Sequence, residues 1–260
     1  MQLTERRRKE IARLSRKKHR DETGECILEG FRSVDAAIDA GADIRDILVA
    51  ESVEVPARLM RRAPVPITRT DERTLMKLTE TTTSPGVLAV VGIPVFGLDG
   101  LADARRILVL DSVQDPGNVG TLVRTAAWFG VDAVVAGPGT ADFWSPKTLR
   151  ATMGGVWDVP LLVVDDLAET LRGLGMPVFV ADMDGTPVRS WAAPERSVLV
   201  LGSEAHGVSA AVRALSHGSV SIPMGGRQSE PETGHGRTSG RGVESLNVAV
   251  AGGILIAAWS

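Results

Sequence analysis

The second half of the chain contains a series of short, continuous apolar runs, which limit the possible folds more than any other feature. They lie at residues 107–110, 133–136, 161–164, 178–181 and 198–201, with a shorter run at 220–222. A strand with one face in water alternates apolar and polar residues, whereas a strand buried on both faces is apolar throughout. Helical patterns lie between these runs, at residues 119–129, 167–173, 210–215 and 246–258. The sequence therefore predicts an α/β fold with a parallel sheet covered by helices on both faces.

The first 92 residues show a second alternation of helical and strand patterns, which predicts a small α/β domain. We expect helices at 4–20, 31–40 and 71–78, and strands at 26–28, 44–50, 65–67 and 86–92. Prolines, glycines and polar residues then follow at 93–104, a composition typical of a linker between domains. We therefore expect an N-terminal domain at 1–94, a linker at 95–104 and a C-terminal domain at 105–260.

The charge of the chain is distributed unevenly. The net charge is −3, yet residues 1–20 carry nine Lys and Arg against Glu5 and Glu10. Such a basic arm either binds a polyanion or forms a solvated amphipathic helix, and the residues alone leave both open. Aromatic residues make up 4% of the chain and tyrosine is absent, which disfavours a base-stacking platform. If the protein binds nucleic acid, phosphate and shape contacts should dominate.

Several common classes of protein are not supported by the sequence. The single cysteine, Cys26, rules out an internal disulfide, and the four histidines lack metal-ligand spacing. No apolar run is long enough to span a bilayer, and the charged N-terminus lacks the apolar region of a signal peptide. A phosphate-binding P-loop and a hydrolase nucleophile elbow are also missing. We therefore expect a cytoplasmic protein without a metal.

Three segments place polar residues and glycines at the end of an apolar run. They are residues 108–130, residues 199–209, and residues 221–226 together with 244–259. Each lies at the carboxyl end of an expected strand, and in an open α/β sheet ligands bind at that edge. The same residues have simpler interpretations, since polar side chains often cap helices or lie in ordinary turns. The pattern alone leaves both interpretations open.

Five side chains in these segments are candidates for a site. Asn118 is expected to cap a helix that carries Arg124 six residues later, where the guanidinium is either solvated or directed at an anion. Glu204 lies in a turn between two glycines. Ser245 fits a helix N-cap, and Asn247 is expected in the first turn of the same, almost wholly apolar helix.

Taken together, these segments resemble the three motifs of the SpoU (TrmH-type) RNA 2′-O-ribose methyltransferases of the SPOUT class. The matching stretches are D-S-V-Q-D-P-G-N-V-G-T-L-V-R-T-A-A, L-G-S-E-A-H-G and I-P-M…S-L-N-V-A-V-A, in that order. Residues 145–150, S-P-K-T-L-R, are similar to the family's segment between its first two motifs. The stretch E-G-F-R-S-V at 29–34 resembles the start of the substrate-binding domain of the family's ribosomal-RNA members. The resemblance covers nearly the whole chain.

The resemblance implies a fold that composition does not show. It implies a parallel sheet whose C-terminal segment forms a trefoil knot, a rare exception to the absence of knots in proteins. It also implies an N-terminal domain similar to ribosomal protein L30e and a homodimer with its active site near the interface. S-adenosyl-L-methionine would bind in the knot through the backbone of Gly202, Ile222 and Leu246, with Leu201 and Met224 lining the adenine pocket.

The expected reaction is methylation of a ribose 2′-hydroxyl, in which the attacking oxygen must lose a weakly acidic proton. Arg124 can stabilise the developing alkoxide or hold the 3′-phosphate. Asn118, Glu204, Ser245 and Asn247 match the family's other site positions, and we expect them to position Arg124 and the ribose. Such a displacement requires no metal.

The resemblance to the ribosomal-RNA members favours rRNA as the substrate, with 23S rRNA of the large subunit expected. A tRNA 2′-O-methyltransferase and a non-catalytic RNA-binding or ribosome-assembly factor with the same fold remain alternatives. One departure from the family pattern is the twenty-residue insertion between Met224 and Ser245, residues 225–244.

Overall fold

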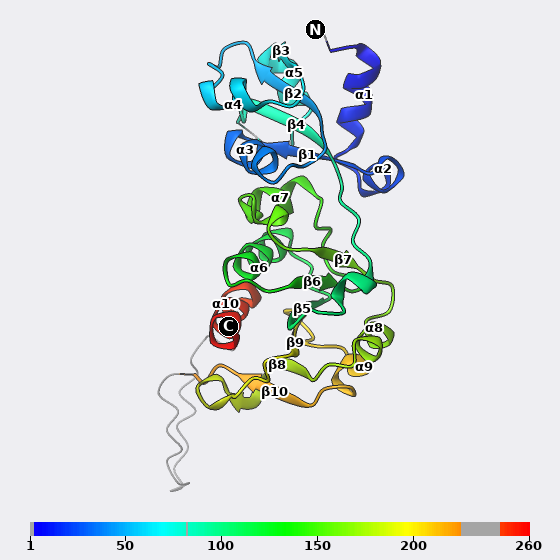
Figure 1. Cartoon of the computed structure of the whole chain (residues 1–260), viewed down its shortest axis with the longest axis vertical. Helices are drawn as coiled ribbons and strands as arrows, with labels where there is room; N and C mark the ends of the chain where they lie inside the picture. Colours follow the sequence, from blue (N-terminus) through cyan, green and yellow to red (C-terminus); the bar gives the residue numbers. More distant parts are fainter. Residues whose placement is uncertain (1–2, 82, 225–244) are drawn as a thin grey trace, which may run out of the picture.

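The computed structural model describes residues 3–81, 83–224 and 245–260. Two separate sheets follow one another along the long axis of the molecule (Figure 1). The C-terminal sheet has six strands in the order β10-β8-β9-β5-β6-β7, and every pairing is parallel. Its strands are β5 (Arg106–Asp111), β6 (Ala133–Ala136), β7 (Leu161–Val163), β8 (Val178–Pro187), β9 (Ser197–Gly202) and β10 (Gly218–Ser221). The predicted parallel sheet is confirmed.

Helices cover both faces of this sheet, as the apolar strands predict. The elements between its strands are α6 (Pro116–Trp128), α7 (Pro146–Thr152), η2 (Gly155–Trp157), α8 (Leu167–Leu174), η3 (Val188–Ser190) and α9 (Ala210–Arg213), and α10 (Val248–Trp259) follows the last strand. Buried side chains of α6, α7 and α10 share one core with one face of β5, whereas those of α8 and α9 pack on its other face. Helix α7 was not expected from the sequence.

The N-terminal sheet has four strands in the order β1-β4-β2-β3. Strand β4 (Val87–Gly92) is antiparallel to both β1 (Glu25–Glu29) and β2 (Ile44–Ala50), while β3 (Ile67–Thr70) is parallel to β2. Its helices are α1 (Glu5–Arg13), α2 (Lys17–Thr23), α3 (Phe31–Asp39), α4 (Ala57–Arg62) and α5 (Glu72–Lys77), and η1 (Leu98–Leu101) lies in the segment before β5. This arrangement confirms the small α/β unit predicted for this part of the chain.

The expected helix over residues 4–20 is wrong in one respect, because it is broken into α1 and α2 around Leu14–Arg16. Nη1 of Arg20 donates hydrogen bonds to the carbonyl oxygens of Leu14 (2.6 Å) and Ser15 (2.8 Å). A long helix would use these two oxygens for its own backbone hydrogen bonds. The expected strand at 65–67 instead begins at Ile67, since Pro64 and Pro66 cannot donate to a strand neighbour.

Two helix caps also differ from expectation. Asp115, rather than Asn118, caps α6, and its Oδ1 accepts from the backbone N–H groups of Gly117 (2.7 Å) and Asn118 (3.1 Å). Asn247, rather than Ser245, caps α10. In both cases the residue chosen from sequence lies within three residues of the true cap, and several residues that can cap are clustered there.

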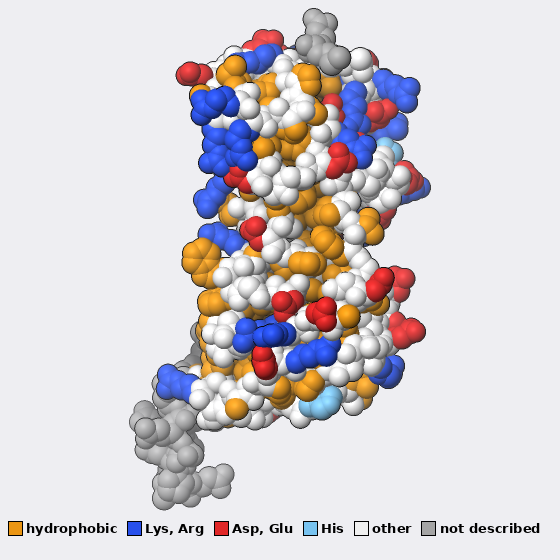
Figure 2. Space-filling view, in the orientation of Figure 1, with side chains coloured by type: hydrophobic (Ala, Val, Ile, Leu, Met, Phe, Trp, Pro, Cys, Tyr) orange, Lys and Arg blue, Asp and Glu red, His pale blue; other side chains and the backbone are white. Residues whose placement is uncertain are grey.

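Most basic side chains of residues 1–20 are paired with carboxylates. The pairs include Arg6–Glu10, Arg8–Glu5, Lys17–Asp21 and Arg20–Asp142, and Arg7 bonds both Glu25 and Asp46. Figure 2 shows basic and acidic side chains interleaved over α1 and α2 at the upper right. The local positive charge is therefore largely balanced by neighbours in the fold, and the role of the arm in RNA binding stays a prediction.

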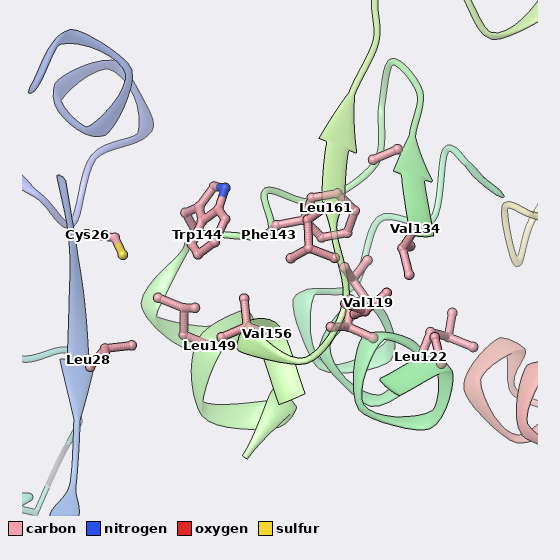
Figure 3. Packing of buried hydrophobic residues seen from close by; sticks show 14 of the residues in the cluster. Cys26, Leu28, Val119, Leu122, Val134, Phe143, Trp144, Leu149, Val156 and Leu161 are labelled. Atoms are coloured by element: carbon pink, nitrogen blue, oxygen red, sulfur yellow. The ribbon is translucent and has the colours of Figure 1, made fainter. Parts of the chain in front are cut away.

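The N-terminal and C-terminal parts share one continuous hydrophobic core. Cys26 and Leu28 of β1 lie opposite Trp144 and Leu149, which belong to α7 and the segment before it (Figure 3). The exact limits of the predicted linker remain a prediction, but the two parts are in direct contact through buried side chains. Among the described residues, no helix is long and apolar enough to cross a membrane. The knot also stays a prediction, because the insertion at 225–244 lies outside the described residues.

Candidate active site

The candidate site is formed where β5, β9 and β10 end at the same edge of the parallel sheet. Strand β5 leads into the cap of α6, and β9 leads into a tight turn in which Ser203 and Gly207 exchange backbone hydrogen bonds of 3.0 and 2.8 Å. Asp111, buried at the end of β5, accepts the backbone N–H of Ser209 at 2.7 Å. That contact ties the first motif to the second.

Asn118 lies at the centre of a hydrogen-bonded chain that joins all three motifs. Its Nδ2 donates to Oε1 of Glu204 at 2.6 Å, and its Oδ1 accepts from Nδ2 of Asn247 at 3.1 Å. Oδ1 of Asn247 in turn accepts the backbone N–H groups of Ala249 (2.9 Å) and Val250 (3.3 Å) at the start of α10. Each amide thereby has a fixed orientation. The structure brings these three predicted residues together across up to 129 positions of sequence.

Helix α6 is held in place at its first turn and at its middle. Nζ of Lys147 donates to Oδ2 of Asp115 at 3.0 Å, and this bond, with the backbone N–H of Asn118, lowers the pKa of the Asp115 carboxyl. Further along, a Cβ at Gly120 would lie 2.5 Å from both the Ala151 Cβ and the Thr148 carbonyl oxygen. Only glycine therefore permits α6 and α7 to pack this closely.

Arg124 lies on the same helix, six residues beyond Asn118, and is exposed. The structure records no hydrogen bond or ion pair from its guanidinium to any described residue. Behind it, α6 is packed against η2, where a Cβ at Gly155 would lie 3.2 Å from the Arg124 Cα. The backbone of Arg124 is fixed, while its charged group faces outward and is available to an anionic oxygen.

Ser245 is not joined to this chain of hydrogen bonds. It is exposed, two residues before the α10 cap, and no side-chain hydrogen bond to another described residue is recorded for it. Its neighbour Glu244 lies outside the described residues. The structure therefore connects Asn118, Glu204 and Asn247 directly, places Arg124 on the same helix as Asn118, and leaves Ser245 beside them.

The residues expected to bind a cofactor lie around the same edge but differ in exposure. Met224 and Leu246 are apolar side chains with 38% and 47% of their surface exposed, and Ile222 is half-buried. A Cβ at Gly202 would overlap the backbone of Gly207 and Val208, so the turn after β9 closes tightly around that glycine. Leu201 is buried, and its side chain lies where a Cβ on Gly252 of α10 would be.

Sequence reasoning missed three residues that support this site. Asp111 ends an apolar strand, and a carboxylate at that point was the available signal for a contact with a neighbouring loop. Asp115 and Lys147 were visible as residues but not as a pair, because they are 32 positions apart. Among the described residues, no group of three or more His, Cys, Asp or Glu could hold a metal ion.

Comparison with known proteins gives consistent matches over most of the chain. The model of the SpoU rRNA Methylase family matches residues 105–229, and that of the MRM3-like substrate binding domain matches residues 6–89. The chain is 33% identical to the 23S rRNA (guanosine(2553)-2′-O)-methyltransferase RlmP of Bacillus subtilis, over 95% of this chain and 93% of that protein.

Two solved structures have nearly the same fold over nearly the whole chain. One is a putative RNA methyltransferase of the TrmH family from Porphyromonas gingivalis, with a TM-score of 0.82, 30% identity and coverage of 100% of this chain and 98% of that one. The other is the SpoU methyltransferase AviRb from Streptomyces viridochromogenes in complex with AdoMet, with a TM-score of 0.81 and 25% identity over 99% and 97% of the two chains.

Proposed function

The chain belongs to the SpoU family of RNA methyltransferases, and from this premise we propose that it methylates a ribose 2′-hydroxyl of 23S rRNA with S-adenosyl-L-methionine as donor. The MRM3-like substrate-binding domain at residues 6–89 supports a ribosomal RNA substrate, and the similarity to RlmP supports the large-subunit RNA. With rRNA as substrate, we expect the enzyme to act in the cytoplasm.

The observation that carries this proposal is the chain of hydrogen bonds from Glu204 through Asn118 to Asn247. It joins residues of three separate motifs at the open edge of the sheet, where ligands bind in such folds. The fold does not require these exposed polar side chains to bond one another, because each of them could form hydrogen bonds with water instead. A non-catalytic RNA-binding factor would have no use for this arrangement, whereas a site that must orient a ribose requires fixed polar groups.

Arg124 supplies the positive charge that the reaction needs. As the ribose oxygen attacks, negative charge develops on it, and a guanidinium held by a rigid helix stabilises that charge without reorganising. The same planar group can hold a phosphate next to the target ribose. Arginine rarely gives up its proton, so we assign Arg124 to charge stabilisation rather than to proton removal. Asn118, Glu204, Asn247 and Ser245 then position the ribose and Arg124.

The apolar residues beside this chain fit the adenosine part of the cofactor. Met224 and Leu246 are exposed, although apolar side chains of this size are usually buried, and an adenine ring would cover them. Backbone groups at Gly202, Ile222 and Leu246 can hold its polar edges, and Gly202 cannot be replaced without moving the turn. Leu201 would support this surface from the core. The bound cofactor supplies a methyl group on a positively charged sulfur, and no metal is needed.

We further propose that the enzyme is a homodimer. Trp128 at the end of α6 is 85% exposed, and Val250 and Ile254 of α10 are also exposed. These two helices pack against each other, and Trp128 lies one turn beyond Arg124 on α6. A second copy docked there would cover them and bring its own residues close to Arg124.

Transfer of radiolabelled methyl groups from S-adenosyl-L-methionine to separated 23S rRNA, 16S rRNA, tRNA and isolated large subunits tests the proposal. We expect label in 23S rRNA or in the large subunit, at one position that resists alkaline cleavage, since a methylated 2′-oxygen cannot attack its own phosphate. Label only in tRNA would contradict the rRNA assignment. Absence of label in all four, with cofactor still bound, would favour a non-catalytic RNA-binding factor.

A further inference from the structure

Selection of one nucleotide requires that the RNA-binding part be held at a fixed place relative to Arg124. The relative RlmP is named for methylation of a single guanosine of 23S rRNA, so an enzyme of this family must select one nucleotide. The contact between the N-terminal and C-terminal parts of this chain can set the distance from the RNA-binding part to Arg124. The inference below rests on the proposed function.

This contact is close and apolar at its centre. Cys26 and Leu28 of β1 face Trp144 and Leu149 across it (Figure 3). At Gly154, just after α7, the backbone has φ +99°, and a Cβ there would lie 2.7 Å from the Cβ of Ala36 in α3. Apolar contact resists separation of the two parts, but it is not directional and does not by itself fix their orientation.

Two ion pairs cross this contact, and the N-terminal part supplies the positive charge in one pair and the negative charge in the other. Arg20 of the N-terminal part bonds Asp142, and Arg150 of α7 donates from Nη1 to Oε2 of Glu29 at 2.5 Å. The side chains of Arg20 and Glu29 are only 3% and 2% exposed. A buried charge left without its partner is strongly unfavourable, so both pairs form together in only one relative placement of the two parts.

Three of the four side chains, Glu29, Asp142 and Arg20, also form hydrogen bonds within their own part. Oε1 of Glu29 accepts the backbone N–H of Glu80 at 3.2 Å, and Oδ1 of Asp142 accepts that of Trp144 at 2.9 Å. Arg20 is held by the carbonyl oxygens of Leu14 and Ser15, which follow α1. Three of the four crossing side chains are therefore fixed within their own part, and Arg150 is carried by helix α7.

Arg150 lies one helix away from the candidate catalytic arginine. It is on α7, one turn after Lys147, which bonds the cap of α6. Helix α7 packs against α6 at Gly120, and Gly155, which follows α7, is packed against the backbone of Arg124. The Glu29–Arg150 bond thus joins the N-terminal sheet to the element that positions α6.

We propose that Glu29 and Arg150 are positioning residues that set the span between the RNA-binding part and Arg124, and so determine which nucleotide is methylated. The geometry assigns them this role because they join β1 to α7 directly and lie between the two functions. Glu29 and Arg150 thus influence where bound RNA lies relative to Arg124, and they do not change cofactor affinity or overall RNA affinity.

The test uses the full chain with four variants: Arg150→Met, Arg150→Lys, Glu29→Gln, and Glu29→Gln combined with Arg150→Gln. Arg172→Met, an exposed arginine near the end of α8, is the control for loss of one positive charge. For each variant, cofactor affinity, RNA affinity, kcat and KM for methyl transfer and the methylated position are measured. The wild-type protein must first label its RNA, and failure there would contradict the proposed function rather than this inference.

We expect Arg150→Met and Glu29→Gln to lower kcat at the wild-type position by about tenfold or more, or to spread methylation to neighbouring nucleotides. Cofactor and RNA affinities should stay within about threefold of wild type. Arg150→Lys keeps the charge and should retain the position, and the Gln–Gln pair should recover part of kcat because it leaves no unpaired buried charge.

Cys26 gives an independent measurement of the contact itself. Burial raises the pKa of its thiol, and it lies beside the Arg20–Asp142 pair, so thiol reagents should react slowly with the native protein. Arg150→Met should increase this rate by about tenfold while cofactor binding persists, which shows a loosened contact in a folded protein.

Two results would overturn the inference. In one, Arg150→Met weakens RNA binding by the same factor as it lowers kcat/KM, with kcat and position unchanged, which would make Arg150 a direct RNA contact. In the other, all variants keep wild-type kcat and position. If Arg150→Met fails to bind cofactor, Glu29→Gln decides, since it preserves shape and the acceptor for the Glu80 N–H.

Discussion

At the scale of single residues, substitution of Arg124 by alanine is expected to lower kcat for methyl transfer by about 100- to 1,000-fold, the usual cost of removing one group that stabilises developing charge. The side chain is exposed and has no recorded bond to a described residue, so the fold should not depend on it and Tm should stay near that of wild type. RNA affinity, measured by filter binding, should survive. Wild-type kcat in the mutant would remove Arg124 from the mechanism.

The sequence predicted the residues of the site better than their contacts. Asn118, Glu204 and Asn247 were chosen by resemblance and then found in one hydrogen-bonded chain. The helix caps were assigned to the wrong residues because several residues that can cap lie close together, and only three-dimensional contacts distinguish Asp115 from Asn118. Asp111 was missed, since its partner is a backbone N–H 98 positions away.

At the scale of helices and strands, patterns predicted most elements but not those fixed by distant side chains. The six parallel strands were predicted from their apolar runs, because a strand buried on both faces is apolar throughout. The break between α1 and α2 did not, since it depends on Arg20 taking the carbonyl oxygens of Leu14 and Ser15. Helix α7 is short and starts at a proline, so its periodicity was too brief to recognise.

The cap of α6 should be sensitive to acid. Lys147 and two backbone N–H groups lower the pKa of Asp115, so the folded state favours its charged form. The stability that this carboxylate adds is present above its unfolded pKa and is lost as the pH falls through its folded pKa. Lys147→Met should raise the pKa of Asp115 toward its ordinary value. The stability that the carboxylate contributes should then begin to fall at a higher pH.

Carboxyl carbon NMR shifts, followed between about pH 5 and about pH 2, measure this directly. Asp71, which caps α5 by accepting the N–H of Thr74 at 2.9 Å and also has a lowered pKa, is the matched control, because Lys147 is not among its partners. Its titration should be the same in both proteins. An unchanged Asp115 titration in Lys147→Met would show that the ion pair does not persist in solution.

The basic arm should contribute less to RNA binding than its composition indicates. Deleting it would remove Ile11 and Leu14, which are buried, as well as Arg20, so substitutions are the better test. Arg13 and Arg16 are exposed and have no recorded carboxylate partner among the described residues. Salt weakens RNA binding, and the slope of log K against log salt concentration measures how strongly. Changing both arginines to glutamine should reduce the magnitude of that slope by up to about 0.7 for each phosphate that is no longer neutralised. Changing the paired Arg6 and Arg8 should leave that slope nearly the same.

At the scale of the whole molecule, the sequence predicted two units joined by a linker but not how they are joined. Glu29 and Arg150 are 121 positions apart, and Arg20 and Asp142 are 122 apart, so no local pattern pairs them. The apolar residues of β1 also look like part of an N-terminal core. The structure shows that one face of β1 continues into the core around α7. A pair of domains that looked separable therefore forms one packed body.

The exposed apolar side chains of α6 and α10 lead to a prediction about assembly. Trp128, Val250 and Ile254 are large apolar residues in contact with solvent on two adjacent helices, and burying them against a second copy is favourable. Sedimentation of the wild-type protein should therefore give twice the chain mass of 27.5 kDa. Ile254→Arg should give the mass of a single chain, because a buried unpaired charge opposes docking.

Methyl transfer should fall together with dimerisation in Ile254→Arg, since Arg124 lies one turn before Trp128 and the partner copy would complete its surroundings. Met183→Arg is the control, because Met183 is also an exposed apolar residue but lies in β8 rather than on α6 or α10. It should remain dimeric and active. A wild-type protein that sediments as one chain while it methylates RNA at full rate would show that the apolar faces of α6 and α10 serve another contact.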